Sequence, residues 1–177
     1  MKKPILTIIG PNKSLCTPLQ RKHAEMAGQL AVELGYRVMT GGERGVMESA
    51  FIGAKKAANY QSGDTIAISP KESAVGDDCL ADIVIYTGLG HARNYIMAHG
   101  QIILAIGGGT GTLSEMAMAW SKCRPILAFA GSGWAGKLAG KRLDGRRKDR
   151  VVLVRGRKDL AAKLQQFSGR LSRSPVR

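Results

Sequence analysis

The sequence has only three cysteines and no long apolar run. Cys16, Cys79 and Cys123 lie far apart and form no C-x-x-C pair, which argues against a disulfide framework and a zinc site and favours reduced thiols in a cytoplasmic protein. No apolar stretch approaches the ~20 residues that span a membrane. The N-terminal MKKPILTIIG lacks a small-residue cleavage site, so we expect a first strand rather than a signal peptide, and no membrane partner.

Acidic residues are scarce in one part of the chain. Residues 1–136 carry 13 basic and 10 acidic side chains, a net charge of +3, whereas residues 137–177 carry 14 basic and 3 acidic side chains, a net charge of +11. Charge of this kind attracts polyanions, so nucleic acid is a candidate partner for residues 137–177. The segments 137–150 and 169–177 are also typical of a solvated loop and tail.

The pattern of apolar residues predicts one α/β domain. The chain has 177 residues, 44% hydrophobic and 23% charged, and its short runs rich in Ile and Val alternate with segments of helical period. This alternation predicts a three-layer, doubly wound, mostly parallel sheet of the Rossmann-like class. Strands are expected at residues 4–9, 36–39, 65–69, 83–86, 101–106, 125–130 and 151–154. Helices are expected at residues 18–34, 45–59, 91–99, 112–123 and 158–167. We assign residues 1–168 to this domain and residues 169–177 to a disordered basic tail.

Glycine-rich turns follow four of the expected strands. They read GPNKS at 10–14, TGGERGVME at 40–48, TGLGHARN at 87–94 and GGGTGTLSE at 107–115. In a parallel sheet these turns share the edge formed by the carboxyl ends of the strands, where open α/β sheets bind their ligands. Any one of them is as often a simple tight turn, but four together predict a shared site.

The turn at 107–115 predicts an anion site at the start of a helix. It does not match the dinucleotide fingerprint, because Ser114 stands where the third glycine would be. A near P-loop at 131–137 is followed by Leu138 and therefore lacks the hydroxyl that binds magnesium. Backbone N–H groups, the Thr110 and Thr112 hydroxyls and the helix dipole favour a phosphorylated small molecule. We expect positive φ or close ligand approach at Gly109. No His, Cys or carboxylate spacing predicts a protein-bound metal.

Three stretches together resemble a known superfamily. GGGTGTLSE is similar to the P-G-G-x-G-T-x-x-E signature of the Lonely Guy cytokinin-activating phosphoribohydrolases, also known as lysine-decarboxylase-like proteins. TGGERGVMESAFIGA resembles their T-G-G-x-x-G-[LV]-M-x-A-x-x-x-G-A stretch. TGLGHARN is closer to the molybdenum-cofactor carrier-like Rossmann proteins, which also resemble the Rossmann domain of DNA processing protein A. The likeness covers roughly residues 4–130, and it implies a homo-oligomer.

The resemblance also implies roles for individual residues. Glu115 stands at the position of the hydrolases' catalytic glutamate, and Arg93 stands where these enzymes have the arginine of an Arg-Lys pair. Gly107 and Asn94 replace their proline and lysine, and both changes point toward the carrier-like branch. The candidate catalytic residues are Glu115 and Arg93. The candidate ligand-binding residues are Gly10, Gly41, Gly42, Gly45, Gly88, Gly90, Arg93, Asn94, Gly108, Gly109, Thr110, Gly111 and Thr112.

The chemistry of these residues is compatible with more than one function. A carboxylate such as Glu115 could stabilise the positive charge that develops when a base leaves ribose 5′-phosphate, or could activate water; it could also be an ordinary helix-start carboxylate. Arg93 could hold the phosphate or the carboxylate, or form a surface salt bridge. The leading hypothesis is a carrier-like protein that binds a phosphorylated nucleotide or pterin-type cofactor non-covalently. The alternatives are a nucleoside 5′-monophosphate phosphoribohydrolase and a nucleic-acid-binding protein, so enzymatic activity is left open.

Overall fold

The fold is a parallel sheet between two layers of helices. A computed structural model describes residues 2–76 and 78–171. In this part of the chain the strands are β1 (Ile5–Ile9), β2 (Arg37–Thr40), β3 (Thr65–Ser69), β4 (Ile83–Tyr86), β5 (Ile102–Ala105), β6 (Ile126–Phe129) and β7 (Val152–Val154). They form one sheet in the order β4-β3-β2-β1-β5-β6-β7, and every pairing is parallel. The predicted fold class is confirmed, and each expected strand lies within a residue or two of its observed bounds.

The helices follow the prediction less closely. They are α1 (Pro18–Glu33), α2 (Val46–Lys55), the 3₁₀ helix η1 (Gly90–Arg93), α3 (Asn94–Met97), α4 (Thr110–Ser121), α5 (Gly133–Leu138) and α6 (Arg157–Leu171). The expected helix 91–99 is a 3₁₀ turn followed by one α-helical turn, and α4 begins two residues earlier than expected. α5 was not predicted, because a six-residue segment with two glycines carries no helical periodicity. α6 extends three residues into the segment assigned to the tail, and residues 172–177 lie outside the described residues.

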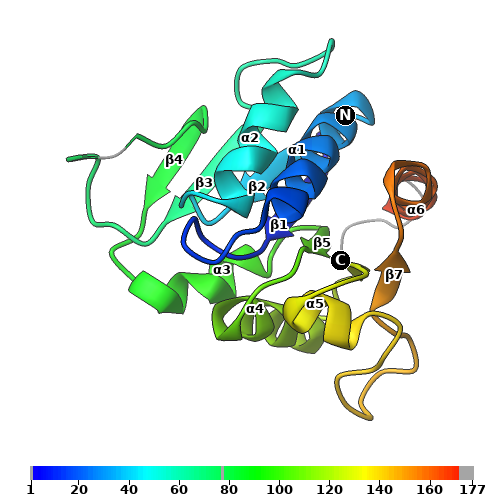
Figure 1. Cartoon of the computed structure of the whole chain (residues 1–177). Coiled ribbons are helices and arrows are strands. Elements are labelled where there is room, and N and C mark those ends of the chain that lie inside the picture. The colour runs from blue at the N-terminus through cyan, green and yellow to red at the C-terminus, as the bar shows by residue number, and fades with distance from the viewer. Residues whose placement is uncertain (1, 77, 172–177) are drawn as a thin grey trace.

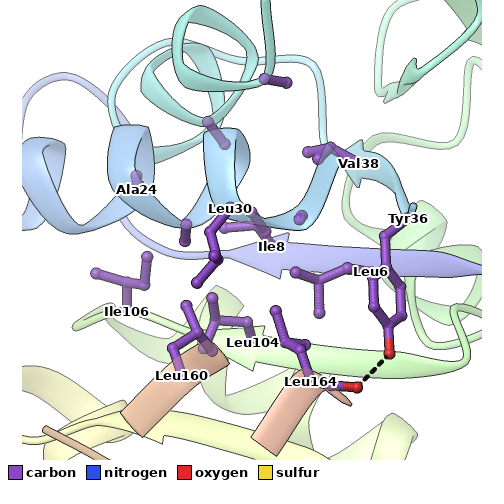
Figure 2. Packing of buried hydrophobic residues seen from close by; sticks show 14 of the residues in the cluster. Leu6, Ile8, Ala24, Leu30, Tyr36, Val38, Leu104, Ile106, Leu160 and Leu164 are labelled. Carbon is purple, nitrogen blue, oxygen red and sulfur yellow. Dashed lines mark hydrogen bonds between the residues drawn. The ribbon is translucent and has the colours of Figure 1, made fainter. Parts of the chain in front are cut away.

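Helices lie on both faces of the sheet (Figure 1), and an apolar cluster joins the sheet to the helices on each face. Alternating strand residues supply them: Leu6 and Ile8 pack toward α1, α2 and α6, whereas Ile9 packs toward α3, α4 and α5. In Figure 2, Leu6 and Ile8 lie beneath α1 and close to the α6 leucines Leu160 and Leu164. The Tyr36 hydroxyl donates a hydrogen bond of 2.7 Å to the Leu164 carbonyl and fixes α6 on this face.

Two glycines allow α1 and α2 to touch through their backbones. A Cβ atom at Gly28 would lie 2.0 Å from the Ala50 carbonyl oxygen, and one at Gly53 would lie 1.8 Å from the Glu25 carbonyl oxygen. The start of α2 is held against the loop after β1 by a hydrogen bond from the Val46 N–H to the Pro11 carbonyl. The close helix pair therefore sets the position of the loops after β1 and β2.

We expect Gly53→Ala to destabilise the protein although alanine is the better helix former. The added methyl group has no space between the helices, and such overpacking costs about 1–3 kcal/mol. Gly169→Ala is the matched control: Gly169 also lies in a helix, but no atom of the described residues lies within 4 Å of its added Cβ atom, so stability should rise by about 0.5–1 kcal/mol. Urea unfolding measures the free energy of unfolding of both variants, and equal m-values make the two values comparable. A stabilised Gly53→Ala protein would contradict the close helix contact.

Candidate ligand-binding cleft

A cleft of about 220 Å³ opens at the carboxyl edge of the sheet. It lies where the strand order reverses: β2 to β4 continue on one side of β1, and β5 to β7 on the other. The loops that follow β1 and β5 lead to α1 and α4 on opposite faces of the sheet, so they separate and leave a crevice. The loops after β2 and β4 complete its walls. The expectation that the glycine-rich turns meet at one edge is therefore met by the topology.

The first turn of α4 forms one wall of the cleft. Gly109 is the N-cap residue, and the first helical hydrogen bond runs from the Leu113 N–H to the Gly109 carbonyl at 3.0 Å. The N–H groups of Thr110, Gly111 and Thr112 therefore have no partner within the helix. All three residues line the cleft, and the positive end of the helix dipole favours an anion in front of them.

The glycines before α4 are held by α5. Gly107 and Gly108 have φ values of 61° and 89°, and a Cβ atom at Gly108 would lie 2.2 Å from the Thr112 hydroxyl oxygen. Their carbonyl groups accept hydrogen bonds of 3.0 Å from the N–H groups of Ala135 and Trp134. The N–H groups at the start of α5 are thus paired with this turn, a second reason that residues 131–137 do not form a phosphate loop.

The expectation of positive φ at Gly109 is wrong. Its φ is −97°, as an N-cap residue requires, and an added Cβ atom would have no neighbour within 4 Å. The positive φ values belong to Gly107 and Gly108. Glycine at position 109 leaves the cleft open rather than permitting a special backbone conformation.

Arg93 joins three segments at the floor of the cleft. Its side chain is only about 5% exposed, so it does not form the surface ion pair that the sequence left open. Nε donates to the Ile68 carbonyl at 2.9 Å, and Nη2 donates to the Gly41 carbonyl at 3.2 Å and to Glu43 at 2.7 Å. The guanidinium group therefore connects the ends of β2 and β3 to η1. A Cβ atom at Gly41 would lie 2.7 Å from Nη2, so this glycine makes room for the arginine.

Asn94 connects η1 and α3 to the first turn of α4. Its Oδ1 accepts a hydrogen bond of 3.1 Å from Arg93, and its Nδ2 donates to the Ser114 hydroxyl at 2.8 Å. The Ser114 hydroxyl in turn donates to the Gly111 carbonyl at 2.7 Å. Asn94 thereby orients the helix start that lines the cleft.

Glu115 is a buried acid on the cleft wall. It is the sixth residue of α4 and 9% exposed, which does not fit an ordinary helix-start carboxylate. Its carboxyl group accepts no hydrogen bond from the part of the chain that the structure describes. Burial raises the pKa of Glu115 to about 7, the Arg93 guanidinium opposes this shift and the Glu43 carboxylate adds to it.

The predicted site residues divide into two groups. The cleft is lined by Gly10, Arg93, Asn94, Gly109, Thr110, Gly111, Thr112 and Glu115. The remaining candidates shape the turns behind it and do not line it: Gly41, Gly42, Gly45, Gly88, Gly90 and Gly108. Gly45, for example, has a φ of 88°, and its added Cβ atom would lie 2.7 Å from the Pro11 carbonyl oxygen.

Sequence reasoning did not assign six further residues of the cleft wall. These are Pro11, Asn12, Leu15, Glu43, Met47 and His91. Most of them belong to the same glycine-rich turns, so the sequence did predict that their loops form the site. Which side chain of a loop faces a ligand depends on the loop's conformation, and only the three-dimensional arrangement shows it.

Neither a metal centre nor a membrane-spanning helix occurs in the described residues. Within residues 2–76 and 78–171, no cluster of three or more His, Cys, Asp or Glu side chains could hold a metal ion. No helix in these ranges combines the length and the hydropathy needed to cross a bilayer. Cys16, Cys79 and Cys123 form no disulfide.

Comparison with known proteins gives the family. Residues 3–160 match the family model of the SLOG cluster4 family. The chain belongs to this family. It is also 38% identical over 130 residues to an uncharacterized protein of Archaeoglobus fulgidus, an alignment that covers 73% of this chain and 82% of that protein.

Solved structures of similar fold confirm the superfamily inferred from the motifs. The molybdenum cofactor binding protein of Rippkaea orientalis superposes with a TM-score of 0.81 at 33% identity, covering 95% of this chain and 99% of that one. The molybdenum cofactor carrier protein of Chlamydomonas reinhardtii has a TM-score of 0.75 at 29% identity, with 95% and 99% coverage. The chain is thus similar over nearly its whole length to a protein that binds this cofactor and to one that carries it.

The likeness to DNA processing protein A concerns the fold alone. The Streptococcus pneumoniae structure has a TM-score of 0.64 at 19% identity, and the match covers 91% of this chain but 62% of that one.

In the basic residues 137–177 several cations already have partners. Arg157 pairs with Glu33 at 2.6 Å, and the Arg147 guanidinium lies 4.3 Å from the centre of the Trp120 ring. Nucleic-acid binding through residues 137–177 stays a prediction, as does a homo-oligomer.

Replacement of Arg93 by lysine should destabilise the protein. Lysine keeps the charge but cannot reproduce the fork that reaches Gly41, Ile68 and Glu43 together, and a hydrogen bond to a charged group is worth about 1.5–3 kcal/mol. The control Arg157→Lys alters a half-exposed pair, which should cost less than about 1 kcal/mol. Denaturant unfolding compares the two variants. Equal losses would show that Arg93 does not join the three segments.

Glu115→Gln should stabilise the protein at alkaline pH and leave it unchanged near pH 4. In the unfolded chain the carboxyl group has its ordinary pKa of 4.5, whereas in the folded protein it stays neutral until the pH rises to about 7, so the native state loses stability across this interval. Glutamine removes the loss, a gain of roughly 3 kcal/mol. Glu48→Gln is the control, because Glu48 lies in the first turn of α2 and its loss should cost about 0.5 kcal/mol at high pH. Unfolding curves at several pH values measure the difference in stability between Glu115→Gln and the parent protein. A difference that does not grow as the pH rises would contradict the prediction.

Proposed function

We propose that this protein binds a phosphorylated pterin-type or nucleotide ligand in the cleft, as a molybdenum-cofactor carrier-like protein. The observation that carries the proposal is the first turn of α4. Its three N–H groups have no partner within the helix, and they belong to residues that line the cleft at the point where the strand order reverses. Its likeness to a molybdenum cofactor binding protein and to a carrier protein supports this choice of ligand.

The residues of the cleft suit such a ligand. The phosphate would take the N–H groups of residues 110–112. The ring of a pterin or purine has polar N–H groups on its edge and apolar faces. On the cleft wall, the Glu43 carboxylate can accept hydrogen bonds from the edge, and the Leu15 and Met47 side chains can pack against a face. At about 220 Å³ the cleft is smaller than the ~300–1,000 Å³ of a typical ligand pocket. Part of the ligand would therefore extend beyond it.

A phosphoribohydrolase is the second candidate, because Glu115 is buried in the same cleft. Its raised pKa of about 7 suits a general acid or base at neutral pH. Two contacts favour the carrier instead. Asn94 stands where the resemblance implies the hydrolases' lysine, and its amide group bonds to Ser114. Arg93 bonds to backbone carbonyls and to Glu43 rather than being held open for a substrate.

The released ligand distinguishes the two functions. Protein purified natively is denatured, and the small molecules it releases are identified by mass spectrometry. A molybdopterin species supports the carrier, whereas AMP-like substrates that are converted to free base and ribose phosphate support the hydrolase. Turnover of such substrates that Glu115→Gln lowers about a hundredfold would overturn the carrier proposal.

Gly109→Val should abolish ligand binding without unfolding the protein. Position 109 has a φ that L-residues adopt and free space around its Cβ position, so the valine side chain would occupy the cleft. Gly145→Val is the control, since among the described residues Gly145 also has no neighbour within 4 Å of an added Cβ atom but lies away from the cleft. Titration calorimetry with the identified ligand should show at least a tenfold loss for Gly109→Val only. Equal affinities in both variants would exclude this cleft as the site.

A further inference from the structure

An acid at an anion site presents an electrostatic conflict. Glu115 is nine-tenths buried, lies on the wall of the cleft and accepts no hydrogen bond from the described residues. The same wall includes the first turn of α4, whose N–H groups have no partner within the helix and favour a negative ligand. An ionised Glu115 would repel that ligand, and its burial weakens the screening by water of this repulsion.

The neighbouring charges do not neutralise Glu115. On the part of the cleft wall that the structure describes, the ionisable side chains are Glu43 from the loop after β2, His91 and Arg93 from η1, and Glu115 from α4. The loop after β1 and helix α2 contribute Asn12, Leu15 and Met47, which carry no charge. Arg93 is the cation that lowers the pKa of Glu115, and it is already bonded to Glu43 at 2.7 Å. Two carboxyl groups therefore share one guanidinium group.

We propose that binding of an anionic ligand in this cleft is coupled to the uptake of one proton by Glu115. The neutral carboxyl group is then a hydrogen-bond donor inside the site instead of a like charge. This inference rests on the proposed function, because it uses the same cleft, and it adds a regulation: the protein releases its ligand more readily as the surroundings become alkaline.

The protonation equilibrium of the free protein is suited to this coupling. Burial raises the pKa of Glu115 to about 7, so near neutral pH the free protein holds Glu115 in both forms. A bound anion favours the neutral form and raises the pKa further. By linkage, affinity is constant while Glu115 is neutral in the free protein and falls by up to about tenfold per pH unit above its pKa.

Sulfate is the probe that tests the coupling, because its charge does not change between about pH 6 and pH 9, unlike that of a phosphate ester. The NMR signals of the backbone amides of residues 109–112 report binding at α4. They distinguish it from sulfate bound at the basic residues 137–177. We expect the affinity at these amides to fall at least tenfold between about pH 6 and pH 9. Calorimetry in two buffers of different ionisation enthalpy should show uptake of about half a proton at pH 7.

Three variants assign the proton. Glu115→Gln should bind sulfate with an affinity that does not vary with pH. His91→Gln should keep the dependence of the parent protein, which matters because histidine side chains also titrate in this range. Glu43→Gln removes a charge that raises the pKa of Glu115, so its affinity should begin to fall at lower pH than in the parent.

Three results would overturn the inference: pH-independent binding by the parent, an unchanged pH dependence in Glu115→Gln, or no shift of the amides of residues 109–112 with sulfate at about pH 6. The ligand identified by mass spectrometry tests the proposed function separately. A molybdopterin species together with pH-independent sulfate binding would leave the carrier proposal standing and remove only the proton coupling.

Discussion

The reversal of strand order between β1 and β5 is the constraint on which the site depends. Both strands run in the same direction, and right-handed crossovers send α1 and α4 to opposite faces of the sheet. The loops must separate above these two strands, so the cleft exists before any side chain is considered. Their bases remain close: a Cβ atom at Gly10 would lie 2.7 Å from the Ile106 carbonyl oxygen. A glycine directly after β1 allows the two strands to end side by side while their loops diverge.

A buried cation fixes the floor of this cleft. A guanidinium group removed from water needs hydrogen-bond partners. Arg93 finds them in two segments that are distant in the sequence, the loop after β2 and the end of β3, and in its neighbour Asn94. The arginine therefore serves the structure first. Its charge still acts on the cleft, since it lowers the pKa of Glu115 against the larger effect of burial. Arg93 thus both fixes the segments around the cleft and influences the pKa of Glu115.

The same geometry makes a hydrolase-like motif compatible with the proposed binding function. In the resemblance, glutamate and an Arg-Lys pair act together, but here Asn94 bonds to Ser114 and orients α4. Glu115 is a buried acid, and the cation that acts on it, Arg93, is also paired with Glu43. Such a group costs stability when it is ionised, a cost typical of residues kept for function. In the proposed function, such a cleft would hold its ligand through backbone N–H groups and a neutral acid, and it would release the ligand without breaking a covalent bond.

The sequence by itself determined the parallel α/β fold, the seven strands, the shared edge of the glycine-rich turns and the superfamily, because these follow from local periodicity and from motifs contiguous in the chain. It placed Gly109 and Glu115 in the right loop but not their conformations. α5 left no signal, since six residues with two glycines have no period. The partners of Arg93 lie up to 52 residues away, and the pKa of Glu115 depends on the elements that pack over it. Only the tertiary structure decided these features, because side-chain direction, burial and pairing are set by segments that meet through folding and not by neighbours in the chain.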